Sequence, residues 1–279
     1  MYADLHLHST ESDGQLTPTE LVEKAKVLGF KAIALTDHDT ISGLSEAQAA
    51  GAAMDLEVIA GIELSAIDTR ERGEVEVHVL GYYINYQDVR LQNVLKQIKN
   101  SRQNRAISMV KKLNDLNILI SIESVEALAG SGTIGRPHIA RAMEEAGYIK
   151  EIKEAFTRKY IGRGGLAYVE RFKISPQDAI QLISDAGGLA VLAHPGFLSD
   201  QTALGEKEIK DYIDFGLAGL EVYYSKHKQD QLKYYEDIVK KYDLLITGGS
   251  DCHGGADSLI GSVKLPYGYV EILKKAVDY

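Results

Sequence analysis

Histidines and carboxylates recur at short spacings along this chain. His6 and His8 form an HxH pair, and Asp251 and His253 form a second pair at the same spacing far along the sequence. On an extended strand, residues i and i+2 point to the same face, so each pair can present two donor atoms to one ion. An HxH pair arises easily by chance. Its meaning therefore depends on the elements that carry these residues.

Short apolar runs alternate with amphipathic patterns along most of the chain, which is typical of parallel strands joined by crossover helices. Thr17-Pro18 and Ser175-Pro176 predict helix starts, and Gly29 and Gly187-Gly188 are the matching stops. Seven strands are expected, at residues 3–9, 32–38, 57–65, 75–84, 189–196, 217–224 and 244–254. The pattern predicts an α/β fold with a barrel of parallel strands.

Residues 88–174 break this alternation. A long amphipathic helix opens the stretch, with apolar positions from Leu91 to Leu113, and smaller helices are expected at 137–146 and 150–160. We assign residues 1–95 and 175–279 to the barrel and residues 96–174 to a helical insertion subdomain. The insertion holds 15 Lys and Arg against 8 Asp and Glu, whereas the rest holds 16 against 32. This asymmetry favours an anionic substrate bound by the insertion, with solvated helix faces as the alternative.

Nearly every predicted strand ends in a histidine or a carboxylate. The C-terminal ends of parallel barrel strands meet at one mouth, so these groups should converge there. Buried together without cations, so many imidazoles and carboxylates would be costly, and histidines that merely pack in a core have no reason to follow strand ends. In chain order the groups are His6, His8, Asp13, Asp37, His38, Asp39, Glu63, His78, His194, Asp251 and His253.

These groups offer nitrogen and oxygen donors without thiolate. Cys252 lies between Asp251 and His253, so it should point away from the mouth and serve packing. Such a mixture suits Mn, Fe or Zn in a reactive site better than a structural zinc–thiolate site. The donors exceed the needs of one ion, so we expect two or three divalent metal ions, with Mn first and Glu63 as the bridge. Such clusters serve phosphoester hydrolysis by a metal-bound hydroxide.

Five motifs in this sequence resemble those of the PHP family, named after polymerase and histidinol phosphatase. They appear in the family's order as DLHLHS at 4–9, TDHD at 36–39, GIELS at 61–65, AHPG at 193–196 and GSDCHG at 249–254. The resemblance implies a distorted seven-stranded (β/α)7 barrel with a trinuclear metal site. It places the metal ligands at His6, His8, Asp13, His38, Glu63, His78, His194, Asp251 and His253. The residues predicted to be catalytic are Asp13, His38, Glu63 and His253.

Within the family, GRPHIA at 135–140 and AYV at 167–169 resemble a bacterial branch of nucleotide phosphoesterases. The resemblance implies hydrolysis of 3',5'-nucleotide bisphosphates or of the 5' ends of short RNA. Arg136 precedes a predicted helix start and is expected to bind phosphate there. Arg158 and Lys159 are further candidate substrate contacts. His227 is a candidate substrate contact or proton donor, with a surface histidine as the alternative.

Three other functions stay open from the sequence. A histidinol-phosphate phosphatase would share the barrel and the metal ligands. It would differ only in the part of the site above the metals, where the substrate binds. A metal-dependent amidohydrolase usually bridges its metals with a lysine, whereas this chain has Glu63. A non-catalytic, metal-stabilised module, such as one associated with a polymerase, often lacks part of the ligand set.

The composition is that of an ordinary globular protein, with 45% hydrophobic and 25% charged residues. The net charge of −9 argues against stable binding of duplex nucleic acid. The first residues, MYADLHLHST, show no signal-peptide pattern, and no uninterrupted apolar run is long enough for a membrane span. The single cysteine, Cys252, cannot form an internal disulfide. We expect a cytoplasmic enzyme of a small phosphorylated substrate, a nucleotide or short RNA, with no membrane partner.

Overall fold

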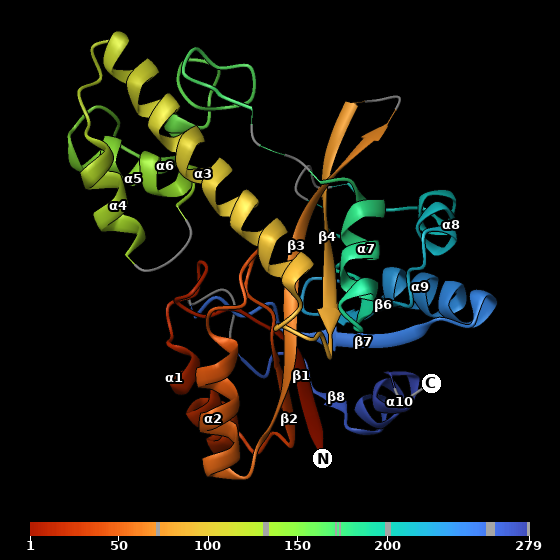
Figure 1. Ribbon diagram of the computed structural model, residues 1–279. Coiled ribbons are helices and arrows are strands. Elements are labelled where there is room, and N and C mark those ends of the chain that lie inside the picture. The colour runs from red at the N-terminus through yellow and green to blue at the C-terminus, as the bar shows by residue number, and fades with distance from the viewer. Residues whose placement is uncertain are drawn as a thin grey trace. The chain divides into compact units, whose positions relative to one another are not determined.

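The computed structural model describes residues 1–70, 73–130, 134–170, 172, 174–198, 202–254 and 260–277 (Figure 1). The chain divides into two compact units. The first combines Met1–Gln92 with Lys173–Tyr279, and the second is Asn93–Phe172. The assignment of residues 96–174 to a substrate-binding subdomain stays a prediction.

The first unit is built around one sheet in the order β7-β6-β5-β4-β3-β2-β1-β8. Its strands are β1 (Tyr2–Leu7), β2 (Ala32–Leu35), β3 (Glu57–Arg70), β4 (Gly73–Tyr82), β5 (Leu189–Leu192), β6 (Gly219–Tyr224), β7 (Leu245–Gly249) and β8 (Leu265–Pro266). Neighbours pair in parallel except that β4 is antiparallel to β3 and β5, and β8 is antiparallel to β1. The expected α/β class is confirmed. The expectation of seven parallel strands is corrected to a mixed sheet of eight.

β3 and β4 account for most of this correction. They pair from Gly61↔Tyr82 to Arg70↔Gly73, and only residues 71 and 72 separate them. Two residues cannot form the crossover that a parallel pair requires, so β4 must run antiparallel. His78 is therefore not at the C-terminal end of a parallel strand, as the sequence pattern predicted. It lies inside β4, opposite Ser65 of β3.

The sheet curls into a nearly closed barrel because β1 meets the segment that follows β7. Leu7 forms a parallel bridge with Cys252, and the His8 N–H donates to the Cys252 carbonyl oxygen at 3.0 Å. This approach requires Gly249, since a Cβ there would lie 2.3 Å from the Cβ of His6. Closure thus brings the N-terminal HxH pair next to the SDCH motif. The predicted strand at 244–254 ends earlier, at Gly249, and Asp251 has a left-handed φ of 54°.

Helices connect most strands of this unit, and α10 follows the last strand. Thr17 and Glu20 form a capping box before α1, and Ser175 accepts from the Asp178 N–H before α7, so both predicted helix starts are confirmed. The helices are α1 (Pro18–Val27), α2 (Leu44–Met54), α7 (Pro176–Asp185), α8 (Glu206–Asp214), α9 (Gln229–Tyr242) and α10 (Gly268–Val277). Apolar side chains from many elements form one core, among them Leu5, Ala34, Ile59, Val191 and Leu273.

The second unit holds most of α3 (Val89–Asp115) together with α4 (Ile122–Ala129), α5 (Arg136–Glu145) and α6 (Ile152–Ala155). It has its own core, which includes Met109, Leu113, Ile139, Met143 and Ile161. The expected helix at 150–160 is wrong beyond one turn. The chain folds back after α6, where the Ile161 N–H donates to the Ala155 carbonyl at 2.9 Å. None of the described helices has the length and apolar character needed to cross a bilayer.

Candidate metal centre

Eight of the nine predicted ligands form three overlapping groups, within each of which the donor atoms lie within 4.8 Å of one another. His8 and His38 each belong to two groups, so the three groups form one continuous cluster. His194 lies outside these groups but approaches the cluster through its Nε2, 3.2 Å from Glu63 Oε1. The groups are His8, Asp13, His38 and His253; His6, His8 and Asp251; and His38, Glu63 and His78.

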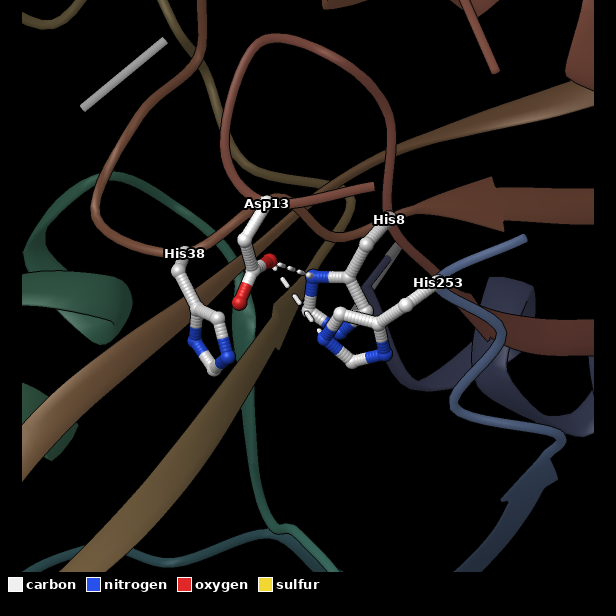
Figure 2. A group of neighbouring side chains, drawn as sticks. All are labelled: His8, Asp13, His38 and His253. Atoms are coloured by element: carbon white, nitrogen blue, oxygen red, sulfur yellow. Dashed lines mark ion pairs between the residues drawn. The ribbon is translucent and has the colours of Figure 1, made fainter. Parts of the chain in front are cut away.

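The first group is shown in Figure 2, where the Asp13 carboxylate points toward the rings of His8 and His253. Asp13 Oδ1 lies 3.9 Å from His8 Nδ1 and 3.3 Å from His253 Nε2 (Figure 2). The two rings stack with centroids 4.2 Å apart. His8 follows β1, His38 follows β2 and His253 follows β7. Strand ends that are far apart in sequence thus deliver donors to one place.

Glu63 lies at the centre of the cluster and is fully buried on β3. Burial raises the pKa of its carboxyl, but the surrounding imidazoles outweigh burial and hold that pKa well below its usual value. The carboxylate is therefore ionised. Its two oxygens lie 2.9–3.4 Å from ring nitrogens of His6, His8, His38, His78 and His194.

Several buried atoms of the cluster make no hydrogen bond within the described part of the chain. They are His6 Nε2, both ring nitrogens of His8, His38 Nδ1, Glu63 Oε2 and His194 Nδ1. An orphaned buried polar atom is costly, and native proteins rarely keep one unless an ion or water satisfies it. Two ligands at about 2.1 Å from one cation are separated by about 3.0–3.4 Å. His6 Nε2 lies 3.4 Å from Glu63 Oε2 and 3.5 Å from Asp251 Oδ1, so the spacing fits a shared cation.

Carboxylate charge controls the titration of the histidines. Burial lowers the pKa of His78, but Glu63 outweighs burial and raises it to about 10. Burial lowers the pKa of His253 in the same way, and Asp13 raises it to about 9. His8 differs, because burial and the neighbouring His253 lower its pKa. Without metal, protons on His78 and His253 balance the carboxylates, and a cation can take their place.

Two strand-end carboxylates act outside the cluster. Asp37 accepts bonds from the N–H and hydroxyl of Ser9 and from the Ser12 hydroxyl, each at 2.6 Å, and so holds the loop that carries Asp13. Asp39 accepts from the Ser65 N–H at 2.9 Å. Both side chains fix the backbone around the proposed ligands.

Glu221, which is fully buried on β6, was not predicted as a site residue. Its Oε1 lies 2.9 Å from His6 Nδ1, and its Oε2 accepts from the His194 N–H at 2.8 Å. The signal was one acid inside the apolar run GLEVYY, since glutamate is rarely buried without partners. β6 was the one strand expected to end in no histidine or carboxylate, whereas it contributes this carboxylate from its interior.

The basic candidates for substrate binding lie in the second unit. Arg136 opens α5, and its guanidinium lies over the Phe156 ring at 5.5 Å from the centroid. Arg158 and Lys159 are exposed. Ser131 to Thr133, the first part of the predicted phosphate loop, lie outside the described residues. The substrate roles of these side chains stay predictions.

His227 lies in the first unit, and both of its ring nitrogens are engaged. Nδ1 lies 2.8 Å from the Val222 carbonyl oxygen, and Nε2 accepts from the Gly196 N–H at 3.1 Å. These two bonds require the proton on Nδ1. A substrate contact by His227 stays a prediction and would require it to release one of these partners.

An aromatic patch adjoins the metal cluster. Tyr224 donates its hydroxyl to Asp251 Oδ2 at 3.0 Å, and its ring centroid lies 5.3 Å from that of His194. Phe197 is 42% exposed with its ring 6.4 Å from Tyr224, and Lys226 Nζ lies 5.2 Å from the Phe197 ring centroid. We call Phe197, Tyr224 and Lys226 the aromatic patch. It offers a partly exposed aromatic ring with a cation over it, beside the cluster.

Known proteins resemble this chain over nearly its whole length. The 5'-3' exoribonuclease of Haemophilus influenzae is 34% identical over 271 residues, 97% of this chain and 93% of its own. The 3',5'-nucleoside bisphosphate phosphatase of Chromobacterium violaceum is 35% identical over 259 residues, 91% of this chain and 89% of its own. A solved structure from Bifidobacterium adolescentis, described as a metal-dependent phosphoesterase, has a TM-score of 0.83 and 31% identity, and covers 97% of this chain and 94% of its own.

The family itself also matches. The PHP domain matches residues 4–170, the part that holds DLHLHS, TDHD and Glu63. The later AHPG and GSDCHG motifs lie in the region that only the full-length relatives cover. The resemblance drawn from the five motifs is therefore confirmed, and this chain belongs to the PHP domain family of phosphoesterases.

Proposed function

We propose that this chain is a metal-dependent phosphoesterase of nucleotides that hydrolyses 3',5'-nucleotide bisphosphates and the 5' ends of short RNA. The observation that carries the proposal is the continuous cluster of three donor groups around the buried Glu63. The names of the relatives from Haemophilus influenzae and Chromobacterium violaceum support the two substrate classes.

The cluster would hold two or three divalent ions, with Mn first and Fe or Zn as alternatives. When bound, such ions lower the pKa of a coordinated water and neutralise charge on a phosphoryl group. The protein's part is to hold the donors in place. Asp37 fixes the loop of Asp13, and the two oxygens of Glu63 lie within 3.4 Å of ring nitrogens of five histidines. The proposed ligands are His6, His8, Asp13, His38, Glu63, His78, His194, Asp251 and His253.

The aromatic patch favours a nucleotide over a small amino-alcohol phosphate. An exposed aromatic ring stacks with any nucleobase, and a lysine beside it attracts phosphate. Phe197 and Lys226 provide both features next to Tyr224, which bonds the proposed ligand Asp251. Arg136, Arg158 and Lys159 are proposed as additional phosphate contacts. Histidinol also carries an aromatic ring, but its imidazole offers less stacking area than a purine base.

The test is phosphate release from 3'-phosphoadenosine-5'-phosphate with added Mn²⁺, measured with malachite green. Parallel reactions contain histidinol phosphate, p-nitrophenyl phosphate and a 5'-phosphorylated RNA pentamer resolved on a gel. Wild type is expected to release phosphate from the bisphosphate at least about 100-fold faster than His8→Ala, because removal of His8 breaks two donor groups. No release above His8→Ala would refute the nucleotide assignment. A clear preference for histidinol phosphate would favour the rival phosphatase.

A further inference from the structure

Glu221 connects two proposed ligands that come from different strands. It is fully buried on β6, and its Oε1 lies 2.9 Å from Nδ1 of His6 on β1. Its Oε2 accepts the backbone N–H of His194, just after β5, at 2.8 Å. Each oxygen therefore has one partner, and each partner belongs to the candidate metal centre.

The bond to His6 determines which of its ring nitrogens faces the cluster. A carboxylate accepts hydrogen bonds, so the His6 proton lies on Nδ1 and Nε2 has a free lone pair. Nε2 lies 3.4 Å from Glu63 Oε2 and 3.5 Å from Asp251 Oδ1, and it makes no hydrogen bond within the described residues. Glu221 thus turns a ligating nitrogen toward the proposed metal position.

The bond to His194 acts on the backbone. His194 has a φ of 28°, in the left-handed region that residues with a Cβ rarely adopt. Its N–H points to Glu221, while its side-chain Nε2 lies 3.2 Å from Glu63 Oε1. The second oxygen of Glu221 therefore holds an unfavourable backbone conformation that aims the His194 ring at the cluster.

We propose that Glu221 is a positioning residue for the metal centre, which orients His6 and His194 together through its two carboxylate oxygens. Because its oxygens bond the His6 ring and the His194 backbone, it acts through these ligands. The proposal rests on the proposed function only in that the cluster binds divalent ions. It is independent of which ester is hydrolysed.

The test is Glu221→Gln, with Mn²⁺ content measured by mass spectrometry after dialysis against a series of free Mn²⁺ concentrations. Glutamine has one acceptor oxygen, so it cannot accept from both His6 and His194. The variant is expected to bind Mn²⁺ 10- to 100-fold more weakly, with an unchanged circular dichroism spectrum. The matched control is Thr247→Val, because Thr247 pairs with Glu221 across β6 and β7 and is equally buried. It should bind Mn²⁺ like wild type.

Wild-type affinity in folded Glu221→Gln would overturn the proposal, and so would an equal loss in Thr247→Val. Wild type that binds no Mn²⁺ would instead overturn the proposed function. If Glu221→Gln does not fold, nitrogen-15 NMR of zinc-loaded wild type decides. A proton on His6 Nδ1 is the expected result, and a proton on Nε2 would overturn the proposal.

Discussion

The substitution Glu63→Gln changes the centre of the cluster while it keeps the size of the side chain. Glu63 is fully buried, and its Oε1 and Oε2 lie 2.9 Å from His78 Nδ1 and His38 Nδ1. Glutamine removes the charge and leaves one acceptor oxygen, so its amide nitrogen must face one of these rings. We expect loss of most of the bound metal and of the phosphoesterase activity.

The magnitude follows from the place of Glu63 in the cluster. Its oxygens lie 2.9–3.4 Å from ring nitrogens of five histidines, so we treat it as a direct ligand. Loss of an outer partner of a ligand typically lowers metal affinity 10- to 100-fold, so loss of Glu63 should lower it by at least about 100-fold. In the metal-free protein, the substitution weakens the hydrogen bond between His78 Nδ1 and Glu63 Oε1, which should also lower the thermal stability.

The assay is Mn²⁺ content after dialysis, together with phosphate release from the bisphosphate. Glu57→Gln is the matched control, because Glu57 lies on the same strand and binds Lys274 Nζ at 2.7 Å and the Tyr267 hydroxyl at 2.8 Å instead of the cluster. The control should keep wild-type metal content and activity. Glu63→Gln that binds Mn²⁺ as tightly as Glu57→Gln would refute the reasoning.

Four further predictions concern other parts of the first unit. Mn²⁺ affinity should rise about tenfold per pH unit for each proton displaced between pH 6 and 9, because Glu63 and Asp13 raise the pKa values of His78 and His253 to about 10 and about 9. The same raised pKa values affect the stability of the metal-free chain. The stabilisation from these imidazolium ions is fully present below the usual histidine pKa of 6.5, and it is lost as pH rises through about 9 and about 10. Phe197→Ala should raise KM for the bisphosphate about tenfold, since stacking on one base contributes about 1–3 kcal/mol. Gly249→Ala should abolish stable folding, because its Cβ would overlap the β1 backbone.

A different result would contradict each of these predictions. The pH dependence is tested by Mn²⁺ titrations at several pH values, with proton release recorded in weak buffer. Equal Mn²⁺ affinities at every pH would mean that the histidines are already neutral in the metal-free protein, and this would contradict the raised pKa values. An equal change in KM for p-nitrophenyl phosphate would show that Phe197 does not contact a base. A normal melting curve for Gly249→Ala would contradict the close approach of Gly249 to His6.

The sequence pattern was most informative where a ligand follows a parallel strand. His8, His38 and His253 lie at such ends, and the geometry of the barrel brings them together. The same reasoning was wrong for His78, which lies inside the antiparallel β4. Its side chain still reaches Glu63 because the long β3–β4 pair places both strands beside the cluster. The short gap before β4 was the available sign that no crossover helix exists there.

Other features depend on contacts between distant segments and leave little trace in local sequence. β8 is two residues long and forms only by pairing with β1. The left-handed backbone at His194 and Asp251 follows from closure of the barrel and from bonds such as that to Glu221. Glu221 itself was detectable as a lone acid in an apolar strand. Its partners, however, could be identified only from the fold.

The most direct test of the central claim is anomalous X-ray diffraction from crystals of the Mn²⁺-loaded protein. We expect two or three anomalous peaks within the cluster, at positions shared by His8 and His38 and beside Glu63. An absence of peaks in the cluster, or peaks only at other positions, would contradict it.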